Sequence, residues 1–314
     1  MVSKEYIILE EAAVEKLLTY ELAVSSIKKC LLEKANGTLN APPKINIEGE
    51  YGSLRITAGA AEGFEKAIGF RLYDTIRDNY SRQPQLNVIY DSVSGQLKGI
   101  IVSKLLGAVR TAALNAVAIG QLARGDSETL CIIGTGYQAR THLQAILAVR
   151  SFKQILLFGR TPEKTVTFKT EMEEATGQSI EIISSIESLV KKADVLMCCT
   201  NSRKPLFNPE WVKAGTTINS IGPKWKTGSE LEPSLIDRCA LVCSDMIEQV
   251  KAYGEDYFID LSGRNNMVDL SDLMVKPELG RKSDEDITLF CCVGLSGTEV
   301  VLGNDLIEKY KEGR

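Results

Sequence analysis

The sequence has few of the residues and segments that build the commonest catalytic centres and membrane anchors. It contains one histidine, His142, in 314 residues, which excludes Ser/His/Asp and Cys/His catalytic arrangements unless His142 serves them. The surrounding stretch, ARTHLQAIL, makes this an ordinary helix position. No apolar run approaches the roughly 18 residues of a membrane span, and the start carries acidic residues where a signal peptide keeps its apolar core. We therefore expect a cytoplasmic protein that does not enter a membrane.

An excess of charge of either sign is also absent. The chain has 37 Lys and Arg against 41 Asp and Glu, which excludes the strongly basic balance that binds nucleic acids. With 44% apolar and 25% charged residues, the composition is that of a soluble globular protein, and a length of 314 residues predicts two domains. We expect neither nucleic acid nor a membrane surface as a partner.

The cysteines do not form a metal-binding pattern. Most of them stand in apolar, strand-like runs, where a thiol packs as a small hydrophobic group. Cys239 and Cys243 are close in sequence, but zinc needs two more soft ligands and His142 lies on a different predicted helix. We expect no metal and reduced, buried thiols at Cys30, Cys131, Cys198, Cys199, Cys239, Cys243, Cys291 and Cys292.

The pattern of apolar residues changes along the chain. Residues 10–36 have apolar positions at helical spacing and end at Asn36-Gly37, which predicts an opening helix. Residues 44–105 are short apolar runs separated by turn residues, which predicts an antiparallel sheet, and an alanine-rich helix follows. From residue 129 strands and helices alternate, with further strands at TTINSIG, ALVCSD and LFCCVGLSG. This alternation predicts a parallel sheet with right-handed crossovers, and hence an α/β fold.

The stretch CIIGTGYQAR, residues 131–140, joins the first strand and helix of the alternating region. It has the form G-x-G-x-x-A, which any tight strand-to-helix turn could use for packing alone. Its position after an apolar strand and before a helix favours a dinucleotide-binding turn. Gly134 would allow the tight turn, Gly136 the approach of the pyrophosphate, and Ala139 the close packing of the helix.

The end of the second strand, LLFGRTPEK, predicts which dinucleotide binds. An NAD site expects a carboxylate here, whereas this chain has Gly159, Arg160 and Thr161. Arg160 could bind a 2′-phosphate through its guanidinium and Thr161 could donate a hydrogen bond to it, so NADP(H) is favoured over NAD(H). Alternatively, Thr161 caps the helix that begins at Pro162, a role that it could fill at the same time.

Three arginines stand in apolar, structured surroundings before the glycine turn. They are Arg55 in SLRITAG, Arg71 in IGFRLYD and Arg110 in AVRTAA. Each alone could be a solvated strand or helix residue. Together they could hold a carboxylate, which guanidinium groups bind in bidentate fashion.

The chain resembles the ornithine cyclodeaminase and mu-crystallin family in a series of motifs that cover nearly its whole length in the family's order. They are VRTAALNAVAIGQLA, CIIGTGYQARTHLQAI, ILLFGRTPEK, ADVLMCCT, INSIG and VGLSG. The resemblance implies a Rossmann dinucleotide-binding domain (118–296) and a smaller α+β substrate and dimerisation domain (1–117 and 297–314). It also implies a homodimer, and hydride transfer between nicotinamide and the α-carbon of an amino or imino acid.

The resemblance also implies roles for single residues. Arg55 and Arg110 match two arginines that hold the substrate carboxylate, and Arg71 replaces a lysine that is more frequent there. Lys224, in IGPKWKTGSEL, replaces an aspartate that handles the substrate amine in cyclodeaminases. Asp74 is a candidate proton donor, with an ordinary surface carboxylate as the alternative, so the catalytic candidates are Arg71, Asp74 and Lys224. Cofactor contacts are expected at Arg110, Thr111, Gly134, Thr135, Gly136, Tyr137, Gln138, Ala139, Gly159, Arg160, Thr161, Cys199, Thr200, Asn201, Ile221, Gly222, Val293 and Gly294.

Three hypotheses for the activity follow. The first is an NADP(H)-dependent oxidoreductase that reduces a small α-imino acid, such as pyrroline-2-carboxylate, or oxidises the amino acid in reverse. The second is a cyclodeaminase that converts ornithine to proline and ammonia, against which Lys224 argues, because a cation disfavours a developing iminium. The third is a protein that binds NADPH and a ligand without turnover, as a mu-crystallin-like hormone carrier would.

Overall fold

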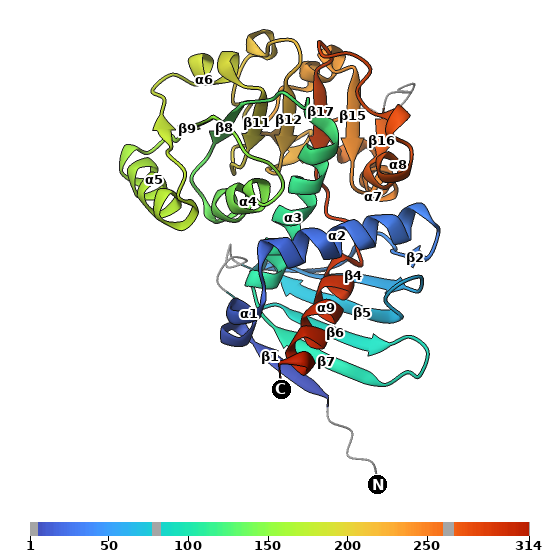
Figure 1. Cartoon of the computed structure of the whole chain (residues 1–314). Helices are drawn as coiled ribbons and strands as arrows, with labels where there is room; N and C mark the ends of the chain where they lie inside the picture. The colour runs from blue at the N-terminus through green and yellow to red at the C-terminus, as the bar shows by residue number, and fades with distance from the viewer. Residues whose placement is uncertain (1–5, 77–82, 260–266, 314) are drawn as a thin grey trace. The chain divides into compact units, whose positions relative to one another are not determined.

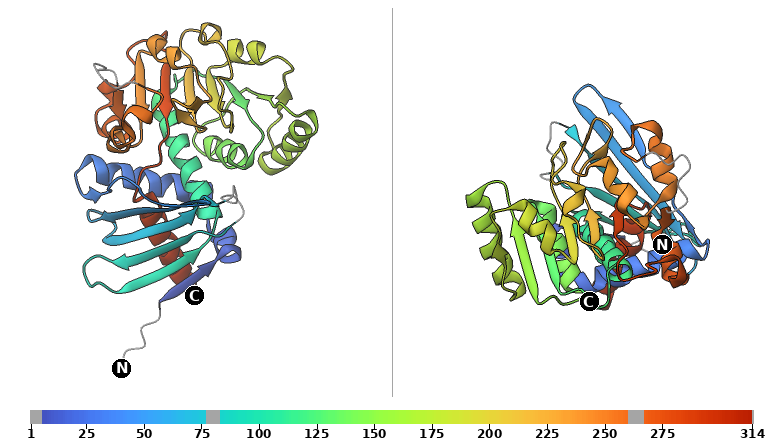
Figure 2. Two further views of the ribbon diagram at one scale, coloured as in Figure 1. Left: turned by 180° about the vertical axis from the view of Figure 1, so that it is seen from behind. Right: turned by 90° about the horizontal axis from the view of Figure 1, so that it is seen from above.

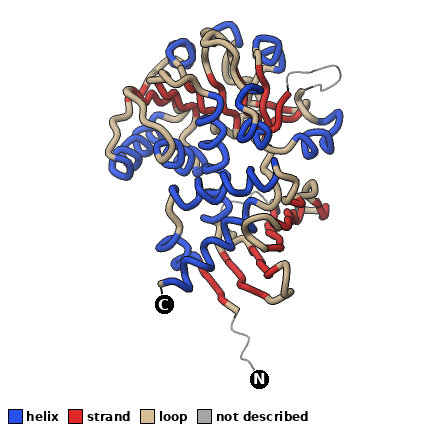
Figure 3. Tube along the Cα trace, turned by 45° about the vertical axis from the view of Figure 1, so that its right-hand side comes forward, coloured by secondary structure: helices blue, strands red, loops and turns tan. Residues whose placement is uncertain are grey.

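The computed structural model describes residues 6–76, 83–259 and 267–313, and the chain divides into two compact units. The first unit is Met1–Leu114 with Gly294–Arg314, and the second is Asn115–Val293. Each unit combines a sheet with helices (Figure 3), as expected for an α/β protein. The assignment of substrate binding and dimerisation to the first unit stays a prediction.

The first unit is built on a mixed sheet. Its elements are β1 (Ile7–Glu10), α1 (Glu11–Leu17), α2 (Tyr20–Ala35), β2 (Leu39–Asn40), β3 (Ile45–Gly49), β4 (Gly52–Ala61), β5 (Ala67–Asp74), β6 (Leu86–Asp91), β7 (Leu97–Val102), the start of α3 (Leu105–Leu122) and α9 (Thr298–Glu312). The strand order is β1-β7-β6-β5-β4-β2, with β3 also paired to β4. α9 packs across β4 to β7, and α2 packs against α9 (Figure 1).

One prediction for this region is wrong in detail. Residues 10–36 are not one helix, because the helical stretch is interrupted between α1 and α2. Thr19 causes this break, since its backbone is extended and its hydroxyl oxygen accepts a hydrogen bond from the Leu22 amide at 3.2 Å. The antiparallel sheet predicted for residues 44–105 is confirmed, since β3 to β7 pair in antiparallel fashion. β1, which lies before this region, adds a parallel strand at the edge beside β7.

The second unit contains the predicted parallel sheet. Its elements are the end of α3, β8 (Thr129–Ile133), α4 (Tyr137–Leu147), β9 (Gln154–Phe158), α5 (Pro162–Thr176), β10 (Glu181–Ile182), α6 (Ile186–Lys192), β11 (Val195–Cys198), β12 (Thr217–Ser220), β13 (Lys224–Trp225), β14 (Gly228–Ser229), β15 (Leu241–Ser244), α7 (Ile247–Tyr253), β16 (Met267–Asp269), α8 (Leu270–Val275) and β17 (Thr288–Cys291), together with the short 3-10 helices Pro209–Trp211, Pro233–Arg238, Gly254–Asp256 and Pro277–Leu279. Helices flank the sheet, as Figure 2 shows. The further strands that the sequence predicts after residue 215 are confirmed as β12, β15 and β17.

The strand order of this sheet fixes where a ligand can bind. The order is β10-β9-β8-β11-β12-β17-β15-β16, and all neighbouring pairs are parallel. The chain therefore moves outward in one direction through β9 and β10 and then returns to the other side of β8 at β11. In open parallel sheets, ligands bind outside the carboxyl ends of the strands at such a switch point. The glycine turn directly follows β8.

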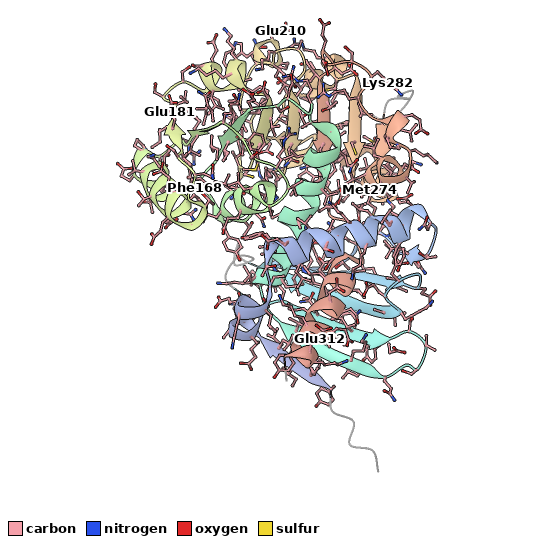
Figure 4. The ribbon with its side chains drawn as sticks, in the orientation of Figure 1. Phe168, Glu181, Glu210, Met274, Lys282 and Glu312 are labelled. Carbon is pink, nitrogen blue, oxygen red and sulfur yellow. The ribbon has the colours of Figure 1, made fainter. Side chains whose placement is uncertain are left out.

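Buried side chains account for the stability of these layers. α3 is 18 residues long and apolar enough to cross a membrane, which differs from the expectation that no apolar run approaches this length, but 78% of it is buried inside the protein. Phe168 on α5, labelled in Figure 4, is buried. The guanidinium carbon of Arg140 lies over its ring, 5.2 Å from the centroid. All eight cysteines are free and buried in the described part of the chain, and burial raises the pKa of the Cys131 and Cys291 thiols to about 12.

Candidate functional site

The turn after β8 requires glycine at Gly134 for steric reasons. Its φ is +114°, and a Cβ atom built there would lie 2.4 Å from the Cys199 carbonyl oxygen. The Gly134 amide donates a hydrogen bond to the Phe158 carbonyl at 3.0 Å, which ties the turn to the end of β9. Gly134 therefore lets the ends of β8, β9 and β11 meet closely.

Gly136 has no such internal requirement. Its φ is −82°, and nothing described lies within 4 Å of a Cβ built on it, so the fold itself would accept a side chain there. Gly136 is the N-cap of α4, where no side-chain oxygen accepts a capping bond and the first helical turn holds no acidic residue. The N-terminus of α4 is therefore at an exposed position with room beside Gly136, an arrangement that suits a phosphate.

The neighbouring residues hold this turn in shape. The Arg140 guanidinium donates hydrogen bonds to the carbonyls of Thr135 at 2.6 Å and Gly136 at 3.2 Å. Ala139 is fully buried, in keeping with the close helix packing that the sequence predicts. Tyr137 and Gln138 are the first two residues of α4. The buried Oε1 of Gln138 has no hydrogen-bond partner among the described residues. The residues present fit a dinucleotide pyrophosphate.

The end of β9 leaves two polar side chains available. Arg160 is exposed, and Thr161 is the N-cap of α5, but its side chain makes no capping hydrogen bond. The interpretation of Thr161 as a capping residue is therefore correct for its position and wrong for its hydroxyl. Gly159 is needed for packing, because a Cβ there would lie 2.0 Å from the Thr165 hydroxyl.

The ends of β11 and β12 are joined by Glu230, a residue that the sequence analysis missed. This fully buried carboxylate accepts hydrogen bonds from the amide and hydroxyl of Thr200, which follows β11, at 3.0 and 2.9 Å. It also accepts from the Ser220 hydroxyl at 2.8 Å and the Gly222 amide at 2.6 Å, both at the end of β12. Burial raises the pKa of the Glu230 carboxyl, and the nearby Lys224 opposes this shift.

Lys224 lies beside the same two strand ends. It is buried on β13, and its ammonium donates hydrogen bonds to the carbonyls of Ser220 at 3.0 Å and Gly222 at 2.8 Å. Two of its three protons are therefore engaged by the backbone. The other predicted cofactor residues of this edge, Cys199, Asn201, Ile221 and Val293, lie directly after β11, β12 and β17.

In the first unit, Arg71 is fully buried and engaged on several sides. Its Nε donates to Gln85 Oε1 at 2.9 Å, and its Nη1 donates to Glu299 Oε1 at 2.7 Å. The guanidinium also lies over the Tyr73 ring, 4.0 Å from its centroid. These partners surround the Arg71 guanidinium with other side chains of the protein. This differs from the sequence-based prediction that Arg71 is available to bind a substrate carboxylate.

Arg110 shares Glu299 with Arg71. Its Nε lies 2.7 Å from Glu299 Oε1 in an ion pair, and its buried Nη1 has no hydrogen-bond partner among the described residues. The two guanidinium groups outweigh burial and hold the pKa of the Glu299 carboxyl at about 2. Glu299, in the first turn of α9, is a second residue that sequence reasoning missed. The only signal in the sequence is an acidic residue directly before the apolar residues 300–302, which is also an ordinary feature of a helix start.

Arg55 and Asp74 lie on opposite faces of the sheet. Arg55 of β4 pairs with Tyr73 of β5, and the next residue but one along β4 pairs with Arg71, so both arginines project to the same face. The Arg55 Nε is buried without a hydrogen-bond partner in the described chain. Asp74 projects to the other face and accepts a hydrogen bond from the Ile76 amide at 3.1 Å. The structure does not bring Asp74 to the arginines.

Two predicted cofactor residues lie beside this arginine group. Gly294 has a φ of +84°, and a Cβ built there would be 3.3 Å from Arg110 Nη1 and 2.9 Å from Lys44 Nζ. Thr111 uses its hydroxyl within α3, donating to the Gly107 carbonyl at 2.8 Å. His142, in contrast, is an ordinary buried helix residue, as predicted, with Nδ1 2.7 Å from the Gln138 carbonyl.

Comparison with known proteins matches nearly the whole chain. A family model described as the ornithine cyclodeaminase/mu-crystallin family matches residues 4–314. A Delta(1)-pyrroline-2-carboxylate reductase of Bacillus cereus (strain ZK / E33L) is 29% identical over 274 residues, which cover 84% of this chain and 83% of that protein. The ketimine reductase mu-crystallin of Macropus fuliginosus is 28% identical over 232 residues, or 72% and 69% of the two chains.

A solved structure extends the similarity to the complete fold. The Delta(1)-pyrroline-2-carboxylate reductase of Thermococcus litoralis, solved in complex with NADH and L-proline, superposes with a TM-score of 0.86 at 26% identity. The match covers 98% of both chains.

Proposed function

The chain belongs to the ornithine cyclodeaminase/mu-crystallin family, and we propose that it reduces a small cyclic α-imino acid with NADPH. In broader terms, it is an NAD(P)H-dependent oxidoreductase acting on the C–N bond of a small α-amino or α-imino acid. Relatives named Delta(1)-pyrroline-2-carboxylate reductase suggest the ring size. The observation that carries the proposal is the pair of unsatisfied buried guanidinium nitrogens on Arg55 and Arg110.

These nitrogens support carboxylate binding. A buried donor without a partner costs free energy, and a carboxylate can accept from two guanidinium groups at once. Glu299 cancels one of the two charges on Arg71 and Arg110, so their group keeps a net positive charge for an anionic substrate. We assign carboxylate binding to Arg55 and Arg110, and we assign Arg71 the role of holding Glu299 and, through it, Arg110.

The chemistry needs little acid or base from the protein. A bound nicotinamide supplies the hydride for the α-carbon. A protonated imine is already electrophilic, so the side chains have mainly to orient the substrate and supply a complementary field. This agrees with the settings of the two candidate proton-transfer groups, each in its own unit. Lys224 is held by two backbone carbonyls, and Asp74 projects from the opposite face of β5 to Arg71.

We propose NADP(H) as the preferred cofactor. Arg160 is exposed at the end of β9, and the Thr161 hydroxyl is not used to cap α5. Both groups are therefore available to a 2′-phosphate, and no carboxylate stands at this strand end to accept ribose hydroxyls. We also propose a cytoplasmic location, since eight free and buried thiols suit a reducing compartment.

We further propose that two copies pair through the face of the first unit's sheet that lies opposite α9. Residues on the α9 side of β5 are buried, whereas those on the other side are exposed or half-buried. Four isoleucines on this outer side are between 45% and 55% exposed, namely Ile8, Ile45, Ile47 and Ile68. A continuous apolar face of this kind is typical of an interface, and a second copy is the partner that the family suggests. The molar mass in solution tests this.

The activity is tested with a panel of cyclic and linear α-imino acids, following the absorbance of NADPH and of NADH. We expect oxidation of NADPH by a cyclic imino acid, and faster turnover with NADPH than with NADH. Formation of proline and ammonia from ornithine without net change in NADPH would identify a cyclodeaminase instead. Tight NADPH binding without turnover of any imino acid would identify a carrier.

The carboxylate contact is tested separately with Arg55→Gln. The wild-type enzyme should discriminate strongly against a substrate amide in place of the carboxylate. In R55Q the carboxylate substrate should lose at least about tenfold in kcat/KM, while the amide loses little, because only the carboxylate used the guanidinium. Equal losses for both substrates would remove Arg55 from the substrate site.

A further inference from the structure

Glu230 and Lys224 both form hydrogen bonds with Ser220 and Gly222, Glu230 as the acceptor and Lys224 as the donor. Glu230 accepts from the Ser220 hydroxyl and the Gly222 amide, whereas Lys224 donates to the carbonyls of Ser220 and Gly222. Both the amide and the carbonyl of Gly222 are thus occupied by side chains of fixed position. The orientation of the peptide groups on either side of Gly222 is set by this pair.

The Glu230 carboxylate also joins two strand ends. Thr200 follows β11 and donates to Glu230 with both its amide and its hydroxyl, while Gly222 follows β12. A Cβ on Gly222 would lie 2.4 Å from Glu230 Oε2 and 2.4 Å from the Thr200 carbonyl oxygen, so the three residues are packed with no spare room. A shift of Glu230 would therefore move both strand ends together.

The topology of the sheet indicates which half of the cofactor this edge faces. A doubly wound sheet binds one nucleotide on each side of its switch point, which lies here between β8 and β11. Arg160 and Thr161, at the end of β9, would take the adenosine 2′-phosphate on one side. The ends of β11 and β12, on the other side, are left for the nicotinamide nucleotide.

We propose that Glu230, with Lys224, is a positioning pair that fixes the Thr200 and Gly222 peptide groups against the nicotinamide half of the cofactor. This inference rests on the proposed function. The pair does not bind the cofactor itself but holds the groups that do. Its loss should disturb the geometry of hydride transfer more than the affinity for the dinucleotide, because the pyrophosphate turn and Arg160 lie on other strand ends.

The test is Glu230→Gln in the full-length enzyme. A glutamine keeps the size of the side chain but turns one acceptor oxygen into a donor, which then faces another donor from Thr200 or Gly222. We expect single-turnover hydride transfer to fall by about tenfold to a hundredfold, the loss associated with misplacing reacting groups by an ångström or less. We expect the Kd for NADPH to change by no more than about threefold, which corresponds to less than 1 kcal/mol. The deuterium isotope effect on turnover should rise as the hydride step becomes limiting.

The matched control is Glu33→Gln in the first unit. Glu33 is also fully buried, and its carboxylate accepts from the Thr38 hydroxyl and from the amides of Gly63, Phe64 and Glu65. E33Q should lower the stability while leaving the hydride-transfer rate of the folded enzyme unchanged. If E230Q transfers hydride at the wild-type rate, or E33Q is slowed as much as E230Q, the inference is wrong.

Two further measurements keep the outcomes separate. If E230Q does not fold, Ser220→Ala removes one of the four hydrogen bonds without a change of charge, and we expect a smaller fall of the same kind. If the wild type reduces no imino acid, the proposed function fails, but the emission of bound NADPH still reports the surroundings of its nicotinamide. The same emission from wild type and E230Q would then overturn the inference, and a shifted emission at unchanged Kd would support it.

Discussion

Glu299 in the first unit and Glu230 in the second are both buried carboxylates with several partners, but the partners differ in charge. Glu299 faces the guanidinium groups of Arg71 and Arg110, and these hold its pKa at about 2. Glu230 faces two amides and two hydroxyls, with Lys224 nearby, and burial raises its pKa. Full charges overcome the cost of burial in the first unit, whereas dipoles do not in the second.

This difference matches the roles proposed for the two units. An anionic substrate in the first unit would need the excess positive charge that remains after Glu299 pairs with Arg71 and Arg110. A nicotinamide in the second unit would need peptide groups in a fixed position, which a carboxylate that accepts four hydrogen bonds can provide. On this proposal, Glu299 adjusts the local charge and Glu230 the local geometry.

Glutamine at each position should separate these two roles, with the larger loss of stability in the first unit. Glu299→Gln leaves two buried guanidiniums without their counter-charge, and breaking such a group costs about 3–5 kcal/mol. Glu230→Gln leaves neutral donors imperfectly paired, which costs about 1–3 kcal/mol. Hydrogen exchange measured on separate peptides gives the loss of local stability, in α9 for E299Q and around β13 for E230Q.

The two units need not unfold together, so a single unfolding midpoint would not give this comparison. Adding Arg71→Met to E299Q should recover part of the loss, because one uncompensated charge is removed with it. A loss in E299Q no larger than that in E230Q would contradict the electrostatic reading of the first unit.

A fall in pH should change the stabilities contributed by the two carboxylates in opposite directions. The folded-state pKa of Glu299 is about 2, below the ordinary value of 4.5 for a glutamate, so its contribution to stability is complete above pH 4.5 and is lost as the pH falls towards 2. The full difference is worth about 3 kcal/mol. Glu230 has a raised pKa, so its contribution is complete below its ordinary pKa and decreases as the pH rises through the folded-state value.

Stability profiles of wild type and single variants across this pH range measure the effect. The loss at acid pH should shrink in E299Q, and the loss on raising the pH should shrink in E230Q. An E299Q profile parallel to that of the wild type would show that other carboxylates dominate acid unfolding.

The sequence predicted the second unit better than the first for a physical reason. The glycine turn is local: β8, Gly134 and the start of α4 are consecutive, and the strands at 217–220, 241–244 and 288–291 are short apolar runs. Thr19 could stand inside one long helix or act as the N-cap of a second helix, and the spacing of apolar residues alone does not distinguish the two. The structure has it as the N-cap of α2. The parallel pairing of β1 with β7 joins segments far apart in the chain.

The same reason separates the site residues that were found from those that were missed. Arg55, Arg71 and Arg110 are conspicuous as single cations in apolar stretches. Glu299 is meaningful only through Arg71, which lies 228 residues away in the sequence, and Glu230 only through the two strand ends that it joins. The burial of Arg71 against Glu299 depends on this same distant contact. The Lys224 hydrogen bonds to Ser220 and Gly222 are local, but they depend on a chain conformation that residue spacing does not show.

The glycine turn offers a sharper comparison within the second unit. Gly134→Ala should reduce both folding and NADPH binding, because its Cβ would meet the Cys199 carbonyl at 2.4 Å. Gly136→Ala should leave the apoprotein as stable as the wild type, since nothing described lies within 4 Å of its Cβ. It should nevertheless weaken NADPH binding by about tenfold to a hundredfold, or 1.4–2.8 kcal/mol, by blocking the approach of the pyrophosphate.

Thermal unfolding with and without NADPH measures both effects, because a ligand that binds only the folded state raises its stability. Wild-type NADPH affinity in G136A would mean that the pyrophosphate does not lie on this turn. Unchanged apoprotein stability in G134A would mean that the tight turn tolerates a side chain.

The smallest expected effect is on cofactor preference, and it distinguishes the proposed 2′-phosphate site at the end of β9 from the proposed nicotinamide site at the ends of β11 and β12. Arg160→Ala should lower the preference for NADPH over NADH by about tenfold, or 1.4 kcal/mol, because an exposed guanidinium then no longer pairs with the 2′-phosphate. The rate of hydride transfer at saturating cofactor should stay at the wild-type value, since Arg160 stands at the end of β9 and Glu230 joins the ends of β11 and β12. E230Q should show the reverse, an unchanged preference with a slower hydride step. The Kd values of both variants for NADPH and NADH, together with their single-turnover rates, test these two expectations. If R160A keeps the wild-type preference for NADPH, residues other than Arg160 select the cofactor.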